Sequence, residues 1–301
     1  MRLRLSFACL FLLTAALLQA QQSQFLQNGA ATIHYRSFGK GQPILIINGG
    51  PGMNSDGFVN LATEMGKQYR AIIYDQRGTG KSVIQPVDST TITLDEMVKD
   101  MEALRQHLGL EKWTVMGQSF GGMLASYYAT QHPQRVERLI LCASGGVDLD
   151  LFNDIGQRLN DRLDQAHVDS LDFWNAAIDG GDTSHFARYH RGLALAPAYL
   201  CNLKHVPAIA ERLTQSNANV NALVWQSMQG MGFDCTAGLK AYKGPALILQ
   251  GLNDILAPRI AEKSKAALPQ ARLVWMKNCS HYAWLDRPDV FWKEIRRFMK
   301  G

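Results

Sequence analysis

Six short, continuously apolar runs constrain the fold of this chain more than any other feature. They lie at residues 44–47, 71–74, 113–116, 139–142, 246–249 and 273–276. A strand that is apolar at every position must be buried on both faces, which is typical of a parallel sheet covered by helices. Longer segments with helical spacing separate most of these runs. This alternation predicts an α/β fold with a mostly parallel, doubly wound sheet.

Helical spacing is clearest at residues 94–108, where apolar side chains recur every three or four positions before Gly109. Residues 120–130 and 289–299 are further helix candidates. Each of these segments follows an apolar run in the chain. They therefore fit the helices that a doubly wound sheet requires.

The alternation stops at about residue 148 and resumes after residue 240. The intervening stretch is rich in helix formers and aromatic side chains and contains no apolar strand. We therefore predict a helical cap at residues 148–240, with residues 21–147 and 241–301 forming the α/β core.

The first twenty residues have the pattern of a secretory signal peptide. Arg2 and Arg4 precede an apolar run at residues 5–18, and Ala20 is a small residue at the expected cleavage point. The run is shorter than the roughly 18 residues that a membrane span needs, although a retained anchor is the alternative. We expect a secreted or periplasmic protein that begins near Gln21 and has no stable membrane insertion after signal removal.

Charge and cysteine content exclude several classes of protein. The formal net charge is +5, and charges of both signs are mixed along the chain, so we predict no nucleic-acid partner. Four cysteines follow the signal peptide, too few for a disulfide scaffold. Cys201 and Cys235 fall in one region and could pair, but connectivity cannot be read from a sequence.

Residues 117–121 read Gly-Gln-Ser-Phe-Gly, which fits the pattern G-x-S-x-G. The pattern follows the apolar run at 113–116 and opens a helix candidate, the context of a nucleophile elbow. Glycines permit the sharp turn that exposes the serine hydroxyl at the sheet edge. Ser119 is therefore the candidate nucleophile; the alternative is a serine that only caps the helix.

A serine nucleophile needs a base and an acid, which in this arrangement follow it in the order acid, then histidine. His281 is the only histidine after the elbow that lies at a strand end near the C-terminus, and it is the candidate base. Asp254 follows the run at 246–249 and is the candidate acid, which would orient His281. Asp148 follows another strand end and is the alternative acid.

The tetrahedral intermediate of acyl transfer needs backbone N–H donors. Phe120, directly after the serine, supplies one candidate. The loop after residues 44–47 reads Asn-Gly-Gly-Pro-Gly, and Gly50 is the second candidate. The alternative is a plain Gly-Pro turn.

Residues 78–82 read Gly-Thr-Gly-Lys-Ser and end like a phosphate-binding loop. Asp75 stands where that loop requires its first glycine, so a structural turn is the better interpretation. The sequence has no zinc-ligand spacing and no dinucleotide fingerprint. We therefore predict neither a metal nor an organic cofactor.

Three segments together resemble the prolyl aminopeptidase (proline iminopeptidase) branch of the α/β-hydrolases. They are N-G-G-P-G at 48–52, D-Q-R-G-T-G-K-S at 75–82 and G-Q-S-F-G-G at 117–122. The resemblance implies an α/β-hydrolase fold with the cap inserted after the sixth strand. It also implies release of N-terminal proline or another residue from short peptides through an acyl-enzyme. Asn48 departs from the histidine that is usual in this branch.

Acidic cap residues hold the free amino group of the substrate in that branch. Glu211 is the only glutamate of the predicted cap and is the candidate for this role. The alternatives are a solvated Glu211 and a contribution from cap aspartates. A carboxylesterase or amidase with the same triad and no need for a free amine is the second candidate function. A non-catalytic binding protein is a third, which the intact triad argues against.

Overall fold

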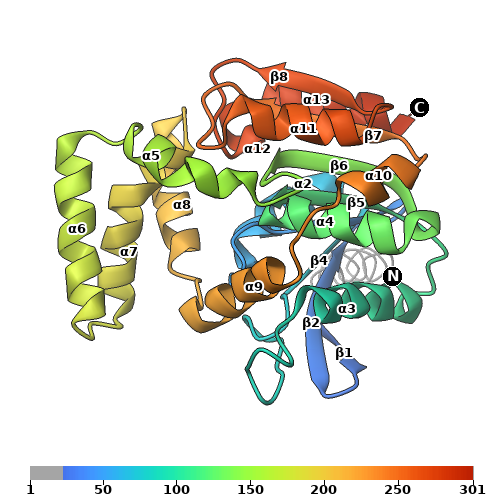
Figure 1. Cartoon of the computed structure of the whole chain (residues 1–301), viewed down its shortest axis with the longest axis horizontal. Coiled ribbons are helices and arrows are strands. Elements are labelled where there is room, and N and C mark those ends of the chain that lie inside the picture. Colours follow the sequence, from blue (N-terminus) through green and yellow to red (C-terminus); the bar gives the residue numbers. More distant parts are fainter. Residues whose placement is uncertain (1–22, 301) are drawn as a thin grey trace, which may run out of the picture.

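A computed structural model describes residues 23–300 and shows an eight-stranded sheet with helices on both faces and a cap at one end (Figure 1). The strands, in chain order, are β1 (Gln24–Asn28), β2 (Ala31–Phe38), β3 (Pro43–Ile47), β4 (Arg70–Tyr74), β5 (Trp113–Ser119), β6 (Val136–Ser144), β7 (Ala246–Gly251) and β8 (Arg272–Met276). Their order across the sheet is β1-β2-β4-β3-β5-β6-β7-β8. The β1–β2 and β2–β4 pairs are antiparallel, and the remaining pairs are parallel.

All six apolar runs lie inside β3 to β8, which confirms the mostly parallel α/β fold. The helices are α2 (Val59–Met65), α3 (Leu94–His107), α4 (Phe120–Gln131), α5 (Ile155–Asn160), α6 (Gln165–Asp179), α7 (His185–Leu195), α8 (Val206–Leu213), α9 (Ala218–Gly230), α10 (Thr236–Ala241), α11 (Pro258–Ala267), α12 (Ala283–Asp286) and α13 (Pro288–Lys300). Helices α3, α4, α10 and α11 contribute to the apolar core on one face of the sheet, and α2 and α13 to that on the other.

Strands β1 and β2 are absent from the six predicted runs, and their composition explains why. The burial of β1 is low along its length, as expected of an edge strand that includes Gln24 and Gln27. Strand β2 is largely buried, but His34 lies at its centre, where the Asp75 carboxylate accepts a hydrogen bond from the ring. A buried polar side chain interrupts the apolar run of its strand, and the hydrogen-bond partner that permits its burial can lie far away in the sequence.

Helices α5 to α9, between β6 and β7, form the cap, which is inserted after the sixth strand as expected. Helices α6, α7 and α8 stand beyond one end of the sheet (Figure 1). The chain leaves and re-enters the core at adjacent points, because Cys235 N donates to Val147 O at 2.7 Å and Asp148 bridges Asp234. The predicted boundary at residue 240 stays a prediction; it assigns most of α10 to the cap, although α10 packs on α4.

Three expectations concern the ends and the thiols of the chain. The predicted signal peptide, residues 1–20, lies outside the described residues. Within residues 23–300 no helix is long and apolar enough to cross a membrane. Cys201 is exposed and Cys235 is buried, and both are free thiols, so they do not pair. Burial raises the pKa of Cys235 to about 12.

Asp75 is the centre of a buried polar network directly after β4. One carboxylate oxygen accepts hydrogen bonds from the backbone N–H and hydroxyl of Ser55, at 2.9 and 2.7 Å. The other oxygen accepts from Lys81 N at 2.9 Å and lies 2.8 Å from Nδ1 of His34. The residues that resemble a phosphate-binding loop therefore form a turn around Asp75, as the sequence favoured.

The same loop supports the chain that follows β3. At the start of residues 48–55, Gln76 Nε2 donates to Asn48 O at 3.0 Å. At the end of the same segment, the Asp75 carboxylate accepts a hydrogen bond from Ser55 N. The segment between them contains Gly50, a predicted oxyanion donor. Hydrogen bonds from the residues that follow β4 therefore hold both ends of the loop that contains the candidate oxyanion donor.

Asp75→Asn should reduce stability at neutral pH, and the loss should shrink as the pH falls. Burial alone would raise the pKa of Asp75, but hydrogen bonds from His34, Lys81 and Ser55 outweigh it and hold the pKa at about 2. A carboxylate with a lowered folded-state pKa stabilises the protein above about pH 4, and this stability is lost as the pH falls through 2. The lowering corresponds to about 2 kcal/mol.

Urea unfolding of both proteins between pH 7 and pH 2 measures this difference. Asp172→Asn, which removes an exposed carboxylate of α6 that has no ion pair or hydrogen bond among the described residues, is the control and should track the wild type. A difference between wild type and Asp75→Asn that stays constant across this range would contradict the assignment.

Candidate active site

Ser119 lies at the turn between β5 and α4, in a strained backbone conformation. Its φ of 56° and ψ of −124° are rare for a residue with a side chain. It occupies the N-cap position of α4, yet its side chain makes no capping hydrogen bond. The helix-capping alternative therefore does not account for this serine, and its hydroxyl is free to face the pocket.

The glycines around Ser119 permit this turn because their neighbours leave no room for a side chain. A Cβ at Gly117 would collide with the carbonyl oxygen of Gly121. A Cβ at Gly121 would in turn collide with the carbonyl oxygen of Ile47, at the end of β3. Helix α4 therefore starts in direct contact with the sheet, which is why the motif needs glycine at both positions.

His281 and Asp254 meet in the loops that follow β8 and β7. The distance from His281 Nδ1 to Asp254 Oδ1 is 2.8 Å, and both side chains are almost fully buried. Gln250 Nε2 donates to the other carboxylate oxygen at 2.8 Å, and the backbone N–H of Leu256 donates to Oδ1 at 3.2 Å. The carboxylate is thus fixed from several sides with one oxygen against the imidazole.

Asp148, the alternative acid, lies elsewhere. Its carboxylate is 2.9 Å from Lys263 Nζ on α11, in a partly exposed ion pair. The structure therefore brings Asp254, and not Asp148, to the candidate base.

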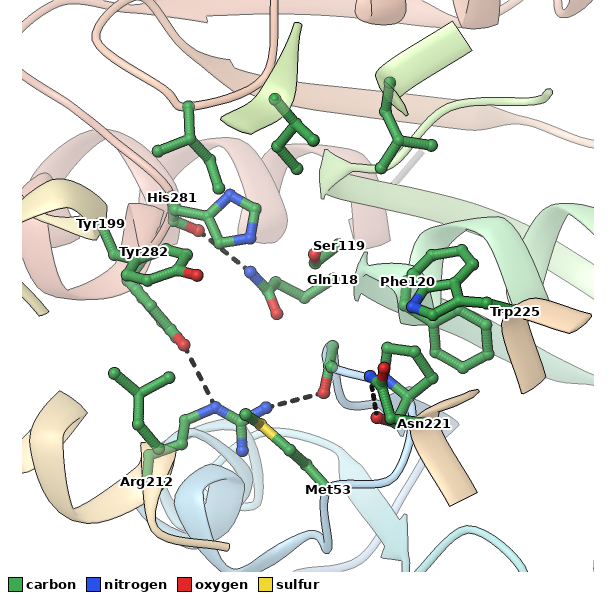
Figure 2. Close-up of a pocket in the computed structure, with 17 residues that line it drawn as sticks. Met53, Gln118, Ser119, Phe120, Tyr199, Arg212, Asn221, Trp225, His281 and Tyr282 are labelled. Atoms are coloured by element: carbon green, nitrogen blue, oxygen red, sulfur yellow. Dashed lines mark hydrogen bonds between the residues drawn. The ribbon is translucent and has the colours of Figure 1, made fainter. Parts of the chain in front are cut away.

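The main chain of His281 is held by both the core and the cap. His281 N donates to the carbonyl oxygen of Tyr199 in the cap at 3.1 Å. Gln118 Nε2, next to the serine, donates to His281 O at 3.2 Å. Figure 2 shows the Ser119 hydroxyl turned toward the imidazole of His281. Tyr199 lies in no recognisable motif and Gln118 occupies a variable position of G-x-S-x-G, so the sequence did not indicate their role.

A pocket of about 160 Å³ opens above Ser119 and His281, between the core and the cap (Figure 2). Its lining residues are Gly49, Gly50, Pro51, Met53, Gln118, Ser119, Phe120, Leu151, Ile155, Tyr199, Arg212, Leu213, Asn221, Trp225, Ile255, His281 and Tyr282. Burial raises the pKa of Tyr199 to about 12, so this phenol is neutral at pH 7. None of these lining residues is an aspartate or a glutamate.

Both predicted oxyanion donors, Gly50 and Phe120, line this pocket beside Ser119. Phe120 is the first residue of α4, so its N–H has no acceptor within the helix, and the positive end of the helix dipole lies there. Gly50 has a φ of 69°, which glycine adopts without strain. The two residues that could supply backbone N–H donors therefore line the same cavity as Ser119.

The profile of the family described as "alpha/beta hydrolase fold" matches residues 42–288 of this chain. The chain belongs to the α/β-hydrolases. Among solved structures, VinJ superposes with a TM-score of 0.73 at 19% identity, over 93% of this hydrolase and 98% of VinJ. The enol-lactonase from Burkholderia xenovorans LB400 gives 0.67 at 20% identity, over 92% of this chain and all of that one. At these identities the likeness concerns the fold alone.

Its sequence relatives place this hydrolase in the proline iminopeptidase branch, as the motifs implied. The proline iminopeptidase of Lactobacillus delbrueckii subsp. lactis is 31% identical over 264 residues, 79% of this chain and 83% of that enzyme. That of Heyndrickxia coagulans is 26% identical over 273 residues, 87% and 92% of the two chains.

Glu211, the predicted partner of a substrate amine, does not line the pocket of this hydrolase. Its carboxylate is exposed and lies 3.0 Å from Nε2 of His185 on the outside of the cap. Its neighbour Arg212 is 2% exposed and lines the pocket instead. The spacing of Ile209 and Arg212 along α8 is the signal that could have shown this, because residues three apart share a helix face.

Asp254→Asn should lower the kcat of ester hydrolysis by roughly 10⁴, because the amide no longer orients and stabilises the imidazolium of His281. Asp148→Asn should stay near the wild type, since Asp148 pairs with Lys263 at the surface. Steady-state kinetics with p-nitrophenyl acetate, after both variants are shown to be folded, measures the difference. The reverse result, with Asp148→Asn inactive and Asp254→Asn active, would show that the acid is Asp148 and not Asp254.

Proposed function

We propose that this hydrolase cleaves an ester or amide by acyl transfer, with Ser119 as nucleophile, His281 as base and Asp254 as acid. The observation that carries the proposal is the 2.8 Å contact from Asp254 to His281 beside a strained serine in a shared pocket. A serine hydroxyl is a weak nucleophile and needs such a base. The family of the chain supports a hydrolase.

In the proposed reaction, Ser119 Oγ attacks the substrate carbonyl carbon and His281 takes the hydroxyl proton. The carbonyl oxygen becomes an oxyanion that accepts hydrogen bonds from Gly50 N–H and Phe120 N–H. The intermediate collapses when His281 returns the proton to the leaving group, which leaves an acyl group on Ser119. Water, deprotonated by His281, then hydrolyses the acyl-enzyme. These steps require no metal or organic cofactor.

Ser119→Ala should abolish hydrolysis and labelling by a fluorophosphonate probe while the protein stays folded. Loss of the nucleophile in such enzymes costs on the order of 10⁴ or more in rate. The matched control is Ser126→Ala, which alters a fully buried serine of α4 whose hydroxyl has no hydrogen-bond partner among the described residues. Fluorophosphonate labelling followed by intact mass reports both. A probe adduct on Ser119→Ala would refute the assignment.

The substrate is the second question, because the relatives and the pocket favour different answers. Relatives named proline iminopeptidase favour an aminopeptidase, whose substrate carries a free amine. A buried ammonium group needs a carboxylate or several acceptors close to it. No aspartate or glutamate is among the described residues that line the pocket, and Arg212 brings a positive charge to its wall. The geometry therefore supports an esterase or amidase without a free-amine requirement, and the aminopeptidase remains the second candidate.

L-prolyl p-nitroanilide and cyclopentanecarbonyl p-nitroanilide separate the two candidates, because they share a shape and differ only in the ring nitrogen. We expect kcat/KM for the two anilides to agree within about threefold, and a p-nitrophenyl ester to react faster. A single hydrogen bond to a charged group contributes about 1.5–3 kcal/mol, so amine recognition would favour the prolyl substrate by tenfold or more. That preference would establish the aminopeptidase.

A further inference from the structure

Arg212 joins the cap to both core loops of the active site. Its Nη2 donates to the carbonyl oxygen of Gly49 at 2.8 Å, and its Nε donates to the hydroxyl of Tyr282 at 3.2 Å (Figure 2). Gly49 lies in the loop after β3, and Tyr282 directly follows His281. The guanidinium also lies 4.7 Å from the ring centre of Phe58. One cap side chain thus contacts the oxyanion loop and the histidine loop together.

Stability alone does not explain this placement. Arg212 is 2% exposed, its contacts among the described residues include no carboxylate, and its Nη1 has no hydrogen-bond partner there. Burying a charge without a counter-ion is unfavourable unless its hydrogen bonds compensate for the lost water. The position of Arg212 is therefore better explained by its hydrogen bonds to Gly49 O and the Tyr282 hydroxyl, which fix these two groups.

The carbonyl oxygen that Arg212 holds belongs to the same peptide unit as the N–H of Gly50. In a trans peptide the C=O and N–H point in opposite directions, so fixing one fixes the other. Glycine stands on both sides of this peptide, and glycine has little preference between positive and negative φ. Without an external contact, rotation of this peptide would turn the N–H of Gly50 away at little energetic cost.

Two donors hold that carbonyl oxygen. Asn48 Nδ2 donates to it at 3.1 Å and Arg212 Nη2 at 2.8 Å, which fills both of its acceptor sites. The Arg212 hydrogen bond is charge-assisted and is the stronger of the two. It also polarises the peptide, which makes the N–H of Gly50 a better donor.

We propose that Arg212 is a positioning residue that keeps the Gly50 N–H directed at the oxyanion, so that the oxyanion hole depends on the cap. The inference rests on the proposed acyl transfer at Ser119. Although Arg212 lines the pocket, its proposed effect on the reaction passes through the Gly49–Gly50 peptide.

Arg212→Met should lower kcat by about 10- to 100-fold and leave KM within threefold. Removal of a whole oxyanion donor costs about 10²–10³ in kcat, and here Asn48 retains part of the orientation. Arg212→Lys keeps the charge but has one compact donor group, so it should recover part of the lost kcat. A large rise in KM at constant kcat in both variants would show a substrate contact and overturn the proposal.

Two ketones report on the oxyanion itself. A trifluoromethyl ketone accepts Ser119 Oγ at its carbonyl carbon, the hydroxyl proton passes to His281, and the carbonyl oxygen becomes an oxyanion. The matching methyl ketone has a similar shape and stays trigonal. In Arg212→Met and Arg212→Lys, Ki for the trifluoromethyl ketone should rise by the same factor as kcat falls, and Ki for the methyl ketone should change less than twofold. Equal weakening of both ketones would indicate a loosened cap and overturn the proposal.

Arg105→Met is the matched control, because Arg105 is also buried in a helix, 5% exposed, and donates to the backbone carbonyl of Leu110 far from the pocket. It should lower the melting temperature and leave kcat within twofold. A fall in kcat equal to that of Arg212→Met would assign the effect to lost stability and overturn the proposal. An active Ser119→Ala would instead refute the acyl transfer, whereas Arg212 variants as active as the wild type would refute this inference alone.

Discussion

The close backbone contact at the turn after β5 sets the geometry of the active site. Helix α4 begins against the carbonyl end of β3, at a distance that only glycine at position 121 allows. This contact places the candidate nucleophile, one candidate oxyanion donor and the loop that carries the other candidate at one sheet edge. The strain at Ser119 is tolerated because a buried strand and a buried helix fix both sides of the turn.

Much of this arrangement was readable from the sequence, because it depends on local signals. Continuous apolar runs identified the six parallel strands, and the order of Ser119, Asp254 and His281 follows from the strand ends. Strand β2 was not predicted because His34 at its centre is polar, and its hydrogen-bond partner Asp75 lies forty-one positions away in the sequence. A local sequence pattern does not indicate a hydrogen bond between residues that are so far apart in the chain.

The presence of a helical cap was predictable, but the packing of its helices was not. Glu211 was predicted to line the pocket because it is the only glutamate of the cap. In the structure its side chain is exposed to solvent, and the neighbouring Arg212 is buried. Which face of a short helix is buried depends on what it packs against, and α8 packs against both the core and another cap helix. A single sequence contains the helical period but not the identity of that partner.

The cap leaves and rejoins the core at adjacent points, where Val147 pairs with Cys235. In evolutionary terms, an insertion whose ends already touch can be lengthened, shortened or exchanged without disturbing the strands on either side. The contacts of Tyr199 and Arg212 with the core limit that freedom, because a replacement cap must again supply an acceptor for His281 N and a donor for Gly49 O. Recombination could therefore alter substrate range readily, but each new cap would have to rebuild these two contacts to keep the chemistry.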